Sequence, residues 1–556
     1  MGGLQVLGRT YRHLSRYREV AGILAKHGFG DLLHVLRLDA GFEGLRRRPR
    51  DETATRAERV RLAVEELGPT FIKAGQYMST RADLLAPEYL RALAKLQDHV
   101  PPFPAAQARA VVEEELGRPI ASLFARFDNR PLAAASIAQI HAARLPDGRE
   151  VVVKIERPGI RRVVANDLEI MAHLAALAEK HLPEWNRRKP TRVIAEIARS
   201  LDRELDFALE AAHTERFARQ FEDDPTVRVP LVHRALSTSR VLTLERVSGR
   251  KADDPAALER AGLDPRVAAE TVSGHYLAMI FVHGFFHADP HPGNLFIQDN
   301  HVVAYVDFGM TGRLDRATRE GLADVIYAVS ERDEALLSRS LLALAEYDSE
   351  PDEREFKSDM AELMDQYAYR PLAEWRLGRM LEQLFQTTAR HGVRIPADLF
   401  LMVKALTEVE SFARNLHPGF DAISASAPYV RRVQEQKTAP GRVAERAAEA
   451  ARETLDLLAS APSELRELIR QARRGRLLLE FEHKGLDPLL TELDQASNRL
   501  AYALLLGALV IGSALLVHAG LPPYWRGIPV FGLAGFTLSA VMAFWLLAAI
   551  IRHGRL

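Results

Sequence analysis

A chain of 556 residues is too long for one small domain, so we expect two or three structural units. Its 74 basic and 74 acidic residues balance, which gives no electrostatic reason to expect nucleic acid as a partner. The chain has no cysteine, which excludes disulfides, cysteine-ligated zinc and cysteine nucleophiles and fits a reducing compartment.

The N-terminal part is predicted to be helical. Residues 1–30 carry scattered basic side chains and no uninterrupted apolar core, which indicates a basic amphipathic helix with a solvated face and no secretory signal; a membrane-surface helix is the alternative. From Glu58 to Lys95 the helical pattern breaks at Gly68-Pro69. Beyond this break Lys73 and Gln76 share a helix face, and Gly75 between them permits close approach of another backbone.

An alanine-rich run follows a helix predicted over residues 105–116. After it, Asp147-Gly148 predicts a two-residue hairpin turn that would pair His141 with Lys154. A small-residue loop followed by a strand lysine is the arrangement of a kinase nucleotide-binding lobe. Alanine restricts the backbone more than glycine, so nucleotide contacts should differ from those of an ordinary kinase. The candidate nucleotide-binding residues are Ala133, Ala134, Ala135, Ser136, Ile137, Ala138, Gln139 and Lys154.

A long helix is predicted to begin at Pro190 and to end near Pro225. On it Asp206 and Glu210 are four residues apart and would share a face, with Glu204 nearby. Because a kinase lobe supplies a helical glutamate to its strand lysine, Glu210 is the candidate partner of Lys154. Next, residues 240–247 are predicted to connect two lobes, and an apolar helix is predicted over residues 268–285.

Two short runs carry the candidate catalytic groups. Asp289 and Asn294 have the spacing of a kinase catalytic loop, and Asp307-Phe-Gly repeats the kinase metal-binding signature. Asp299-Asn300 predicts a two-residue turn that would place Asn294 opposite Tyr305 and bring Asp307 near it. Asp289 would then accept a proton, while Asn294 and Asp307 would bind Mg²⁺. Two alternatives are an ordinary strand-end turn and a hydrolase metal site made of His287, Asp289 and His291.

The C-terminal tail is far more apolar than the rest of the chain. Residues 500–517 and 530–551 lack charged side chains and would span about 27 Å and about 33 Å as helices, which matches a bilayer core of roughly 30 Å. Arginines flank the pair, so the positive-inside rule predicts both ends in the cytoplasm. A buried helical pair in a soluble protein is the alternative.

Together these stretches resemble the UbiB family of atypical kinase-like proteins, also called the aarF-domain or ADCK family. The motifs that carry the resemblance are Lys73-Ala-Gly-Gln76, the alanine-rich loop, Val-Val-Val-Lys154, Glu204-Leu-Asp206, the loop from His287 to Asn294, and Asp307-Phe-Gly. One departure is His213, where the family pattern favours asparagine.

The resemblance implies an α+β, bilobal protein-kinase-like fold with an added N-terminal helical subdomain, a helical C-terminal extension and a C-terminal transmembrane hairpin. The expected segments are 1–57, a basic helical segment; 58–125, a helical extension; 126–250, the nucleotide-binding lobe; 251–420, the catalytic lobe; 421–498, a helical linker; and 499–556, two transmembrane helices.

The family further implies that Lys73 and Gln76, close to Glu204 and Asp206, cover the place where a peptide substrate would enter. We therefore expect an ATP- and Mg²⁺-dependent ATPase or small-molecule or lipid kinase of the inner membrane that supports ubiquinone or related quinone biosynthesis. Lys154, Glu210 and Asp289 would be its catalytic residues. Its partners would be membrane lipids, quinone precursors or quinone-biosynthesis enzymes. The sequence does not decide between a monomer and a homo-oligomer. The alternatives are a non-catalytic ATP-dependent lipid-binding switch, a metallohydrolase and a true protein kinase.

Overall fold

The computed structural model describes residues 15–31, 54–81, 84–96, 100–182, 189–347, 351–368, 375–442, 444–445, 448, 451–452, 454–455, 486–525 and 528–552. The chain divides into two compact units, Met1–Arg446 and Ala447–Leu556. The boundary between the units falls within the predicted helical linker, residues 421–498, of which residues 456–485 lie outside the described residues.

The N-terminal helices of the first unit pack together around a small apolar core. A helix over residues 15–26 contacts α3 (Arg56–Leu67), α4 (Pro69–Met78) and α8 (Ile160–His181) through Val20, Phe71 and Ile170. Arg16 lies on it and pairs with buried Asp167 at 2.9 Å. The predicted break at Gly68-Pro69 is present because Gly68 adopts φ +98° and proline opens the next helix. The short helix α5 (Pro87–Leu93) follows.

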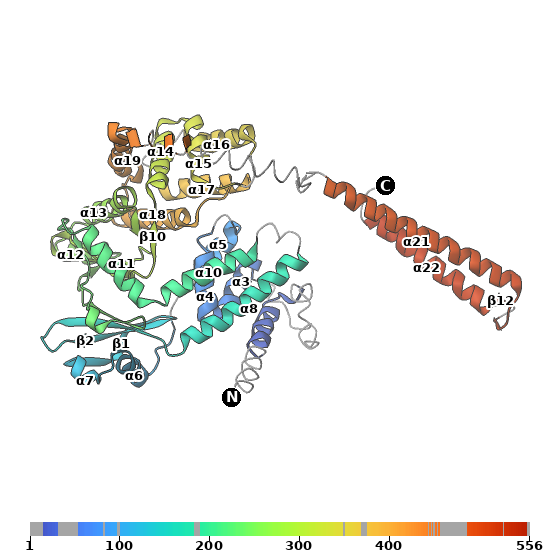
Figure 1. Ribbon diagram of the computed structural model, residues 1–556, viewed down its shortest axis with the longest axis horizontal. Helices are drawn as coiled ribbons and strands as arrows, with labels where there is room; N and C mark the ends of the chain where they lie inside the picture. Colours follow the sequence, from blue (N-terminus) through green and yellow to red (C-terminus); the bar gives the residue numbers. More distant parts are fainter. Residues whose placement is uncertain are drawn as a thin grey trace. The chain divides into compact units, whose positions relative to one another are not determined.

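A four-stranded antiparallel sheet lies in the predicted nucleotide-binding lobe (Figure 1). Its order is β1 (Arg126–Ala134), β2 (Ala138–Arg144), β3 (Glu150–Glu156) and β5 (Val241–Glu245). Successive strand side chains alternate between faces. Val151, Val153 and Ile155 therefore pack with α6 (Ala105–Leu116) and α7 (Ile120–Leu123), which leaves Lys154 on the opposite face.

The β2–β3 hairpin differs by one residue from the predicted register. Arg144 pairs with Glu150, and the loop is closed by a bond from Leu145 N to Arg149 O, so it holds three residues and not two. Gly148 takes φ +91°, which lets the extra residue fit. Lys154 consequently pairs with Ile140, whereas His141 pairs with Val153. A one-residue slip moves every side chain of the strand to the other face of the sheet.

The predicted long helix from Pro190 is two helices. The first, α10 (Pro190–Glu204), runs alongside α8, and the second, α11 (Phe207–Gln220), packs on the Lys154 face of the sheet. Between them Asp206 leaves the helical conformation and caps α11 by accepting the Ala208 N–H at 3.1 Å. Asp206 and Glu210 therefore do not share a helix face, contrary to the prediction. The start of α11 is held by Arg161, which donates to Leu205 O at 2.6 Å.

A second small sheet contains the two strands that connect the predicted catalytic loop to Asp307. Its order is β4 (Val227–Arg228), β9 (Val303–Tyr305), β8 (Leu295–Ile297) and β6 (Arg250–Lys251). The β8–β9 loop is Asp299–His301 and Leu295 pairs with Tyr305, so the predicted pairing of Asn294 with Tyr305 is wrong by one residue. Asn300 and His301 both adopt φ +58°, which accommodates the third loop residue.

Helices surround this sheet in the rest of the first unit. The apolar helix predicted over residues 268–285 is α13 (Pro265–Leu277) followed by a π-helical turn, Ala278–His283. It leads into β7 (Phe285–His287), which pairs with β10 (Thr311–Arg313). The remaining helices are α12 (Pro255–Arg260), α14 (Arg316–Glu331), α15 (Glu334–Leu344), α16 (Glu353–Ala368), α17 (Leu377–Arg390), α18 (Ala397–Leu416) and α19 (Ala422–Thr438). Their apolar side chains and those of α13 form one continuous core.

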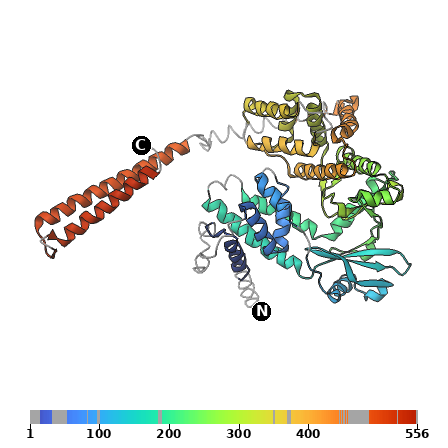
Figure 2. The same ribbon diagram turned by 180° about the vertical axis from the view of Figure 1, so that it is seen from behind.

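The second unit is a helical hairpin of α21 (Leu486–Ala519) and α22 (Val530–Arg552), which lie side by side in Figures 1 and 2. Gly535 permits the close packing, because a Cβ there would lie 2.0 Å from Ser513 Oγ. Among the described residues one stretch, Leu500–Ala519, is long and apolar enough to cross a bilayer, while the apolar stretch described in α22, Val530–Phe544, is shorter. The predicted transmembrane pair is thus matched by one helix.

Acid is expected to destabilise the first unit through His275 on α13. Its Nδ1 lies 3.0 Å from Tyr305 Oη and its Nε2 2.8 Å from Thr226 Oγ1, and burial lowers its pKa to about 4 although Asp224 opposes this. The neutral ring stabilises the fold above pH ~6.5, and this contribution of roughly 3 kcal/mol is lost as pH falls toward 4. Thermal unfolding of the full chain in detergent at pH 7.5 and 5.0 measures the loss.

The matched variant is His275→Gln, which removes this titration. It should be less stable than the wild type at pH 7.5 and should lose less stability on acidification. An equal loss in both proteins would assign the acid sensitivity to other groups.

Candidate active site

Lys154 lies between two carboxylates from distant parts of the chain. Its Nζ is 2.9 Å from both Glu210 carboxylate oxygens and 3.3 Å from Asp307 Oδ1. The side chains of Lys154 and Glu210 are 13% and 4% exposed. The predicted Lys154–Glu210 ion pair is therefore present, and it forms because strand alternation turns Lys154 toward α11.

The three groups strongly affect one another's protonation. Burial lowers the pKa of Lys154, but Asp307 and Glu210 outweigh it and raise that pKa above its usual value. Burial raises the pKa of Glu210 to about 7 despite the Lys154 ammonium. Loss of hydration next to the surrounding protein atoms also raises the pKa of Asp307, yet Lys154 and the Gly309 N–H outweigh it and lower the pKa to about 2. Asp307 is consequently ionised at neutral pH, as a metal ligand must be.

Asp307 is held in an unusual backbone conformation. Its φ is +60°, which is uncommon for residues other than glycine and tolerated best by asparagine and aspartate. Its Oδ1 accepts the Gly309 N–H at 3.1 Å, and the side chain is 44% exposed. Left-handed residues of this kind cluster at functional sites. This turn therefore directs the Asp307 carboxylate toward solvent and Lys154.

The catalytic loop brings Asp289 and Asn294 together. Asn294 Nδ2 donates to the Asp289 backbone oxygen at 3.2 Å and to its Oδ2 at 3.3 Å, which leaves the Asn294 amide oxygen as an acceptor. His287, fully buried, links this loop to the Asp307 strand. Its Nδ1 accepts the Asp289 N–H at 3.1 Å and its Nε2 lies 3.4 Å from Val306 O.

These contacts do not support a His-Asp-His metal site. Both ring nitrogens of His287 face backbone groups, and His291 Nδ1 accepts the Gly293 N–H at 3.1 Å. Across the described ranges, no group of three or more His, Asp or Glu side chains is arranged to hold a metal ion. Asp307 and the Asn294 amide oxygen instead offer the hard oxygen ligands that Mg²⁺ prefers when phosphates complete its shell. The residues present therefore fit Mg²⁺.

Half of the predicted alanine-rich loop is available to a ligand. Ala133, Ala134 and Ala135 are exposed or half-buried at the β1–β2 connection, whereas Ser136, Ile137 and Ala138 are buried. Gln139 is buried on the far side of the sheet, where its amide bonds to both Phe103 backbone groups and lies 2.7 Å from His141 Nε2. The prediction that Gln139 binds nucleotide is wrong, because the shifted register turns it away from Lys154.

The N-terminal motif reaches the edge of the site. Lys73 on α4 forms an ion pair with Glu204 at the end of α10, and their side chains are only 13% and 19% exposed, so Lys73 is not a solvent-facing residue. Its charge helps to lower the pKa of Asp307. Gln76 donates to Leu96 O at 3.2 Å. The close approach at Gly75 is by side chains and not by backbone, since a Cβ there would lie 2.5 Å from Leu96 Cδ1.

The sequence of this chain is similar to those of known proteins. The family model of the ABC1 atypical kinase-like domain matches residues 95–341, that of the UbiB helical domain residues 360–421, and that of the ABC1/UbiB kinase-like C-terminal domain residues 484–552. "Probable protein kinase UbiB" of Marinobacter nauticus is 38% identical over 69% of this chain and 71% of that protein. The chain belongs to the UbiB/ABC1 family. This confirms the resemblance expected from the motifs and the kinase-like α+β fold.

Two further proteins are similar to this UbiB/ABC1 chain. An uncharacterized protein in the hydrogenase 1 5′ region of Clostridium pasteurianum is 31% identical over 97% of this chain and 99% of that protein. The solved complex of Rv3197 with erythromycin from Mycobacterium tuberculosis is 25% identical and covers 64% of this chain and 90% of that chain, with a TM-score of 0.44.

His213, the departure from the family pattern, contacts the Asp307-Phe-Gly segment of this UbiB/ABC1 chain. Its Nδ1 lies 3.4 Å from Phe308 O and 3.3 Å from Thr311 Oγ1. Burial lowers the pKa of the ring, which favours its neutral form. The substituted histidine therefore keeps a polar contact at this position.

Lys404 and Glu408 on α18 also lie at the site and were not predicted from the sequence. Lys404 Nζ lies 3.5 Å from Asp289 Oδ1 and 3.7 Å from Glu408 Oε1. The available signal was two opposite charges four residues apart within an otherwise apolar stretch, Leu399–Val409. That signal does not indicate which loop the pair contacts, more than a hundred residues earlier in the chain.

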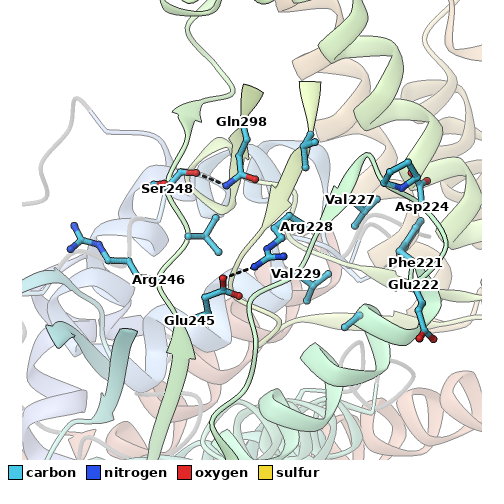
Figure 3. A pocket seen from close by; sticks show the side chains of 14 residues that line it. Phe221, Glu222, Asp224, Val227, Arg228, Val229, Glu245, Arg246, Ser248 and Gln298 are labelled. Carbon is cyan, nitrogen blue, oxygen red and sulfur yellow. Dashed lines mark hydrogen bonds and ion pairs between the residues drawn. The ribbon is translucent and has the colours of Figure 1, made fainter. Parts of the chain in front are cut away.

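A cavity of about 700 Å³ lies beside the linker between the lobes of this UbiB/ABC1 chain (Figure 3). In Figure 3 Gln298 donates to Ser248 O at 2.6 Å and Arg228 pairs with Glu245. The residues that line this cavity include none of the candidate catalytic or metal-binding residues. The cavity is therefore separate from the candidate active site.

Proposed function

We propose that this UbiB/ABC1 chain binds Mg²⁺·ATP and transfers its terminal phosphoryl group to water or to a small or lipid molecule, in support of ubiquinone or related isoprenoid-quinone metabolism. The observation that carries the proposal is the contact of Lys154 with both Glu210 and Asp307. Residues that lie 56 and 153 positions from Lys154 converge on its ammonium group.

Each residue has a task in this reaction. Lys154 binds the α- and β-phosphates and Glu210 orients it, while Ala133, Ala134 and Ala135 cover the phosphates. Asp307 and Asn294 would hold Mg²⁺, which neutralises phosphate charge when bound. Asp289 orients the attacking water or hydroxyl and takes its proton. Phosphoryl transfer depends mainly on such positioning and charge neutralisation, so these few groups suffice.

A small or lipid acceptor is favoured over a peptide. The chain passes from Asp307-Phe-Gly309 directly into β10 and then into α14 at Arg316. This short connection holds no Ala-Pro-Glu segment on which a peptide would dock. The Lys73–Glu204 pair adds helices α4 and α10 at the edge of the site. The regulatory role of Lys73, Gln76, Glu204 and Asp206 belongs to the same proposal.

The membrane and quinone parts of the proposal are supported by the tail and by the family. The apolar stretch Leu500–Ala519 supports anchoring in the inner membrane, and the flanking arginines favour cytoplasmic ends for a two-helix anchor. The UbiB names of relatives support the quinone link. Membrane lipids and quinone precursors are then the expected partners.

The test is ATP turnover by the full chain in lipid nanodiscs with and without Mg²⁺, anionic lipid and a quinone-precursor mimic. We expect Mg²⁺-dependent ADP formation that rises when lipid or mimic is present. Phosphate transfer to added proteins would identify a protein kinase instead. Stoichiometric ATP binding without conversion in a single-turnover experiment would overturn the proposal and favour the non-catalytic switch.

A further inference from the structure

Lys404 and Glu408 on helix α18 lie next to the predicted catalytic loop. Lys404 Nζ lies 3.5 Å from Asp289 Oδ1 and 3.7 Å from Glu408 Oε1, so one ammonium group is shared between two carboxylates. Both contacts are longer than a typical charge-assisted hydrogen bond. The Lys404 side chain is 28% exposed and thus retains access to solvent beside Asp289.

Within the part of the chain that the structure describes, two buried polar atoms here lack a hydrogen-bond partner. One belongs to Glu408 itself and the other lies on α13, which packs against α18. They are Glu408 Oε2 and the hydroxyl of Tyr276 on α13. Burial raises the pKa of the Tyr276 hydroxyl, and Tyr305 and the charges of Asp289 and Glu408 raise it further. Leaving such atoms unpaired costs stability.

The proposed step at Asp289 depends on the orientation of its carboxylate. When an acceptor oxygen bonds to the γ-phosphorus, the bond to ADP breaks, ADP leaves with the electron pair, and Asp289 takes the acceptor's proton. Asp289 becomes neutral in this step, so a neighbouring group can assist by holding the carboxylate toward the acceptor until the proton is transferred. Lys154 is engaged with Glu210 and Asp307, and the loop from His287 to Asn294 contains no lysine or arginine.

We propose that Lys404 is a positioning residue of this reaction. From helix α18 it holds the Asp289 carboxylate in place, and Glu408 in turn holds the Lys404 side chain. The inference rests on the proposed function and assigns the reaction a residue outside the kinase motifs. A structural ion pair alone would affect stability and leave turnover per folded molecule unchanged.

The test compares Lys404→Ala, Lys404→Arg and Glu408→Gln with the wild type, measuring turnover, ATP-analogue affinity and the thermal midpoint of the full chain. Lys404→Ala should lower kcat about 100-fold, the lower range for a general base, and leave affinity within about twofold. Arginine should recover part of kcat. Lys437→Ala is the control, because Lys437 pairs with Asp324 on α14 and is 29% exposed, like Lys404.

A double variant separates the possible outcomes. If Lys404 acts through Asp289, adding Lys404→Ala to Asp289→Asn should cause no further loss of kcat. Independent losses, or normal kcat in Lys404→Ala with an active wild type, overturn this inference alone. A wild type that binds ATP without turnover overturns the proposed function and this inference together. If the alanine variant does not fold, Lys404→Arg and Glu408→Gln supply the same comparison.

Discussion

Replacing Asp307 with asparagine is expected to abolish Mg²⁺-dependent ATP binding by this chain. The substitution keeps the shape of the side chain but removes the charge that Lys154 and the Gly309 N–H hold ionised. Altering groups behind metal ligands already costs ten- to a hundredfold in affinity, so losing a ligand charge should cost at least about 100-fold. Titration with a fluorescent ATP analogue, with and without Mg²⁺, measures the effect.

The fold should survive this change, because the neutral amide introduced at this position would no longer repel Glu210. The control is Asp299→Asn in the β8–β9 loop, where the aspartate is 85% exposed and pairs with Arg250. That variant should bind Mg²⁺·ATP like the wild type. Unchanged Mg²⁺-dependent binding in Asp307→Asn would remove Asp307 from its proposed role.

Replacing Lys154 with methionine should stop turnover and destabilise the first unit. It leaves Glu210, 4% exposed, beside Asp307 without a cation between them. Breaking a buried ion pair by removing one partner typically costs about 3–5 kcal/mol. Turnover and the thermal midpoint should therefore both fall.

A second substitution distinguishes stability from chemistry. Adding Glu210→Gln to Lys154→Met removes the buried charge, so the thermal midpoint should recover while turnover does not. The exposed pair of Arg234 and Glu215 provides a control, and Arg234→Met should cost less than about 1 kcal/mol. Recovery of turnover in the double variant would contradict the proposed role of Lys154.

Local sequence patterns predicted the elements of the site better than their registers. The break at Gly68-Pro69, the strand that carries Lys154 and the hairpin before Asp307 are all present. Both hairpins, however, have three-residue loops where two were expected. Asp147-Gly148 and Asp299-Asn300 favour a turn without fixing its length, which depends on how each strand packs against its helices. Because the β2–β3 register differs by one residue from the predicted register, Gln139 was predicted on the wrong face of the sheet.

Residues from distant elements could not be predicted in the same way. Lys404 lies 115 residues from Asp289 in sequence, and no spacing rule relates a helix to a loop at that separation. Asp206 was misassigned because the helix from Pro190 shows no proline or glycine where it breaks, so the break depends on tertiary packing. The motif residues Lys154, Glu210, Asp289, Asn294 and Asp307 could be proposed from the sequence because kinase motifs occur in a set order, and their roles stay predictions.

The helix that carries Glu210 is secured from several sides. Helix α10 precedes it, Lys73 holds the end of α10 through Glu204, and Arg161 holds Leu205. At the other end of the helix, Gln220 donates to Phe285 O at 3.1 Å. Many kinases are switched off by swinging the corresponding helix outward, which separates the lysine from its glutamate. A helix anchored in this way has little freedom to pivot, so on/off control of this chain is expected to act through substrate access.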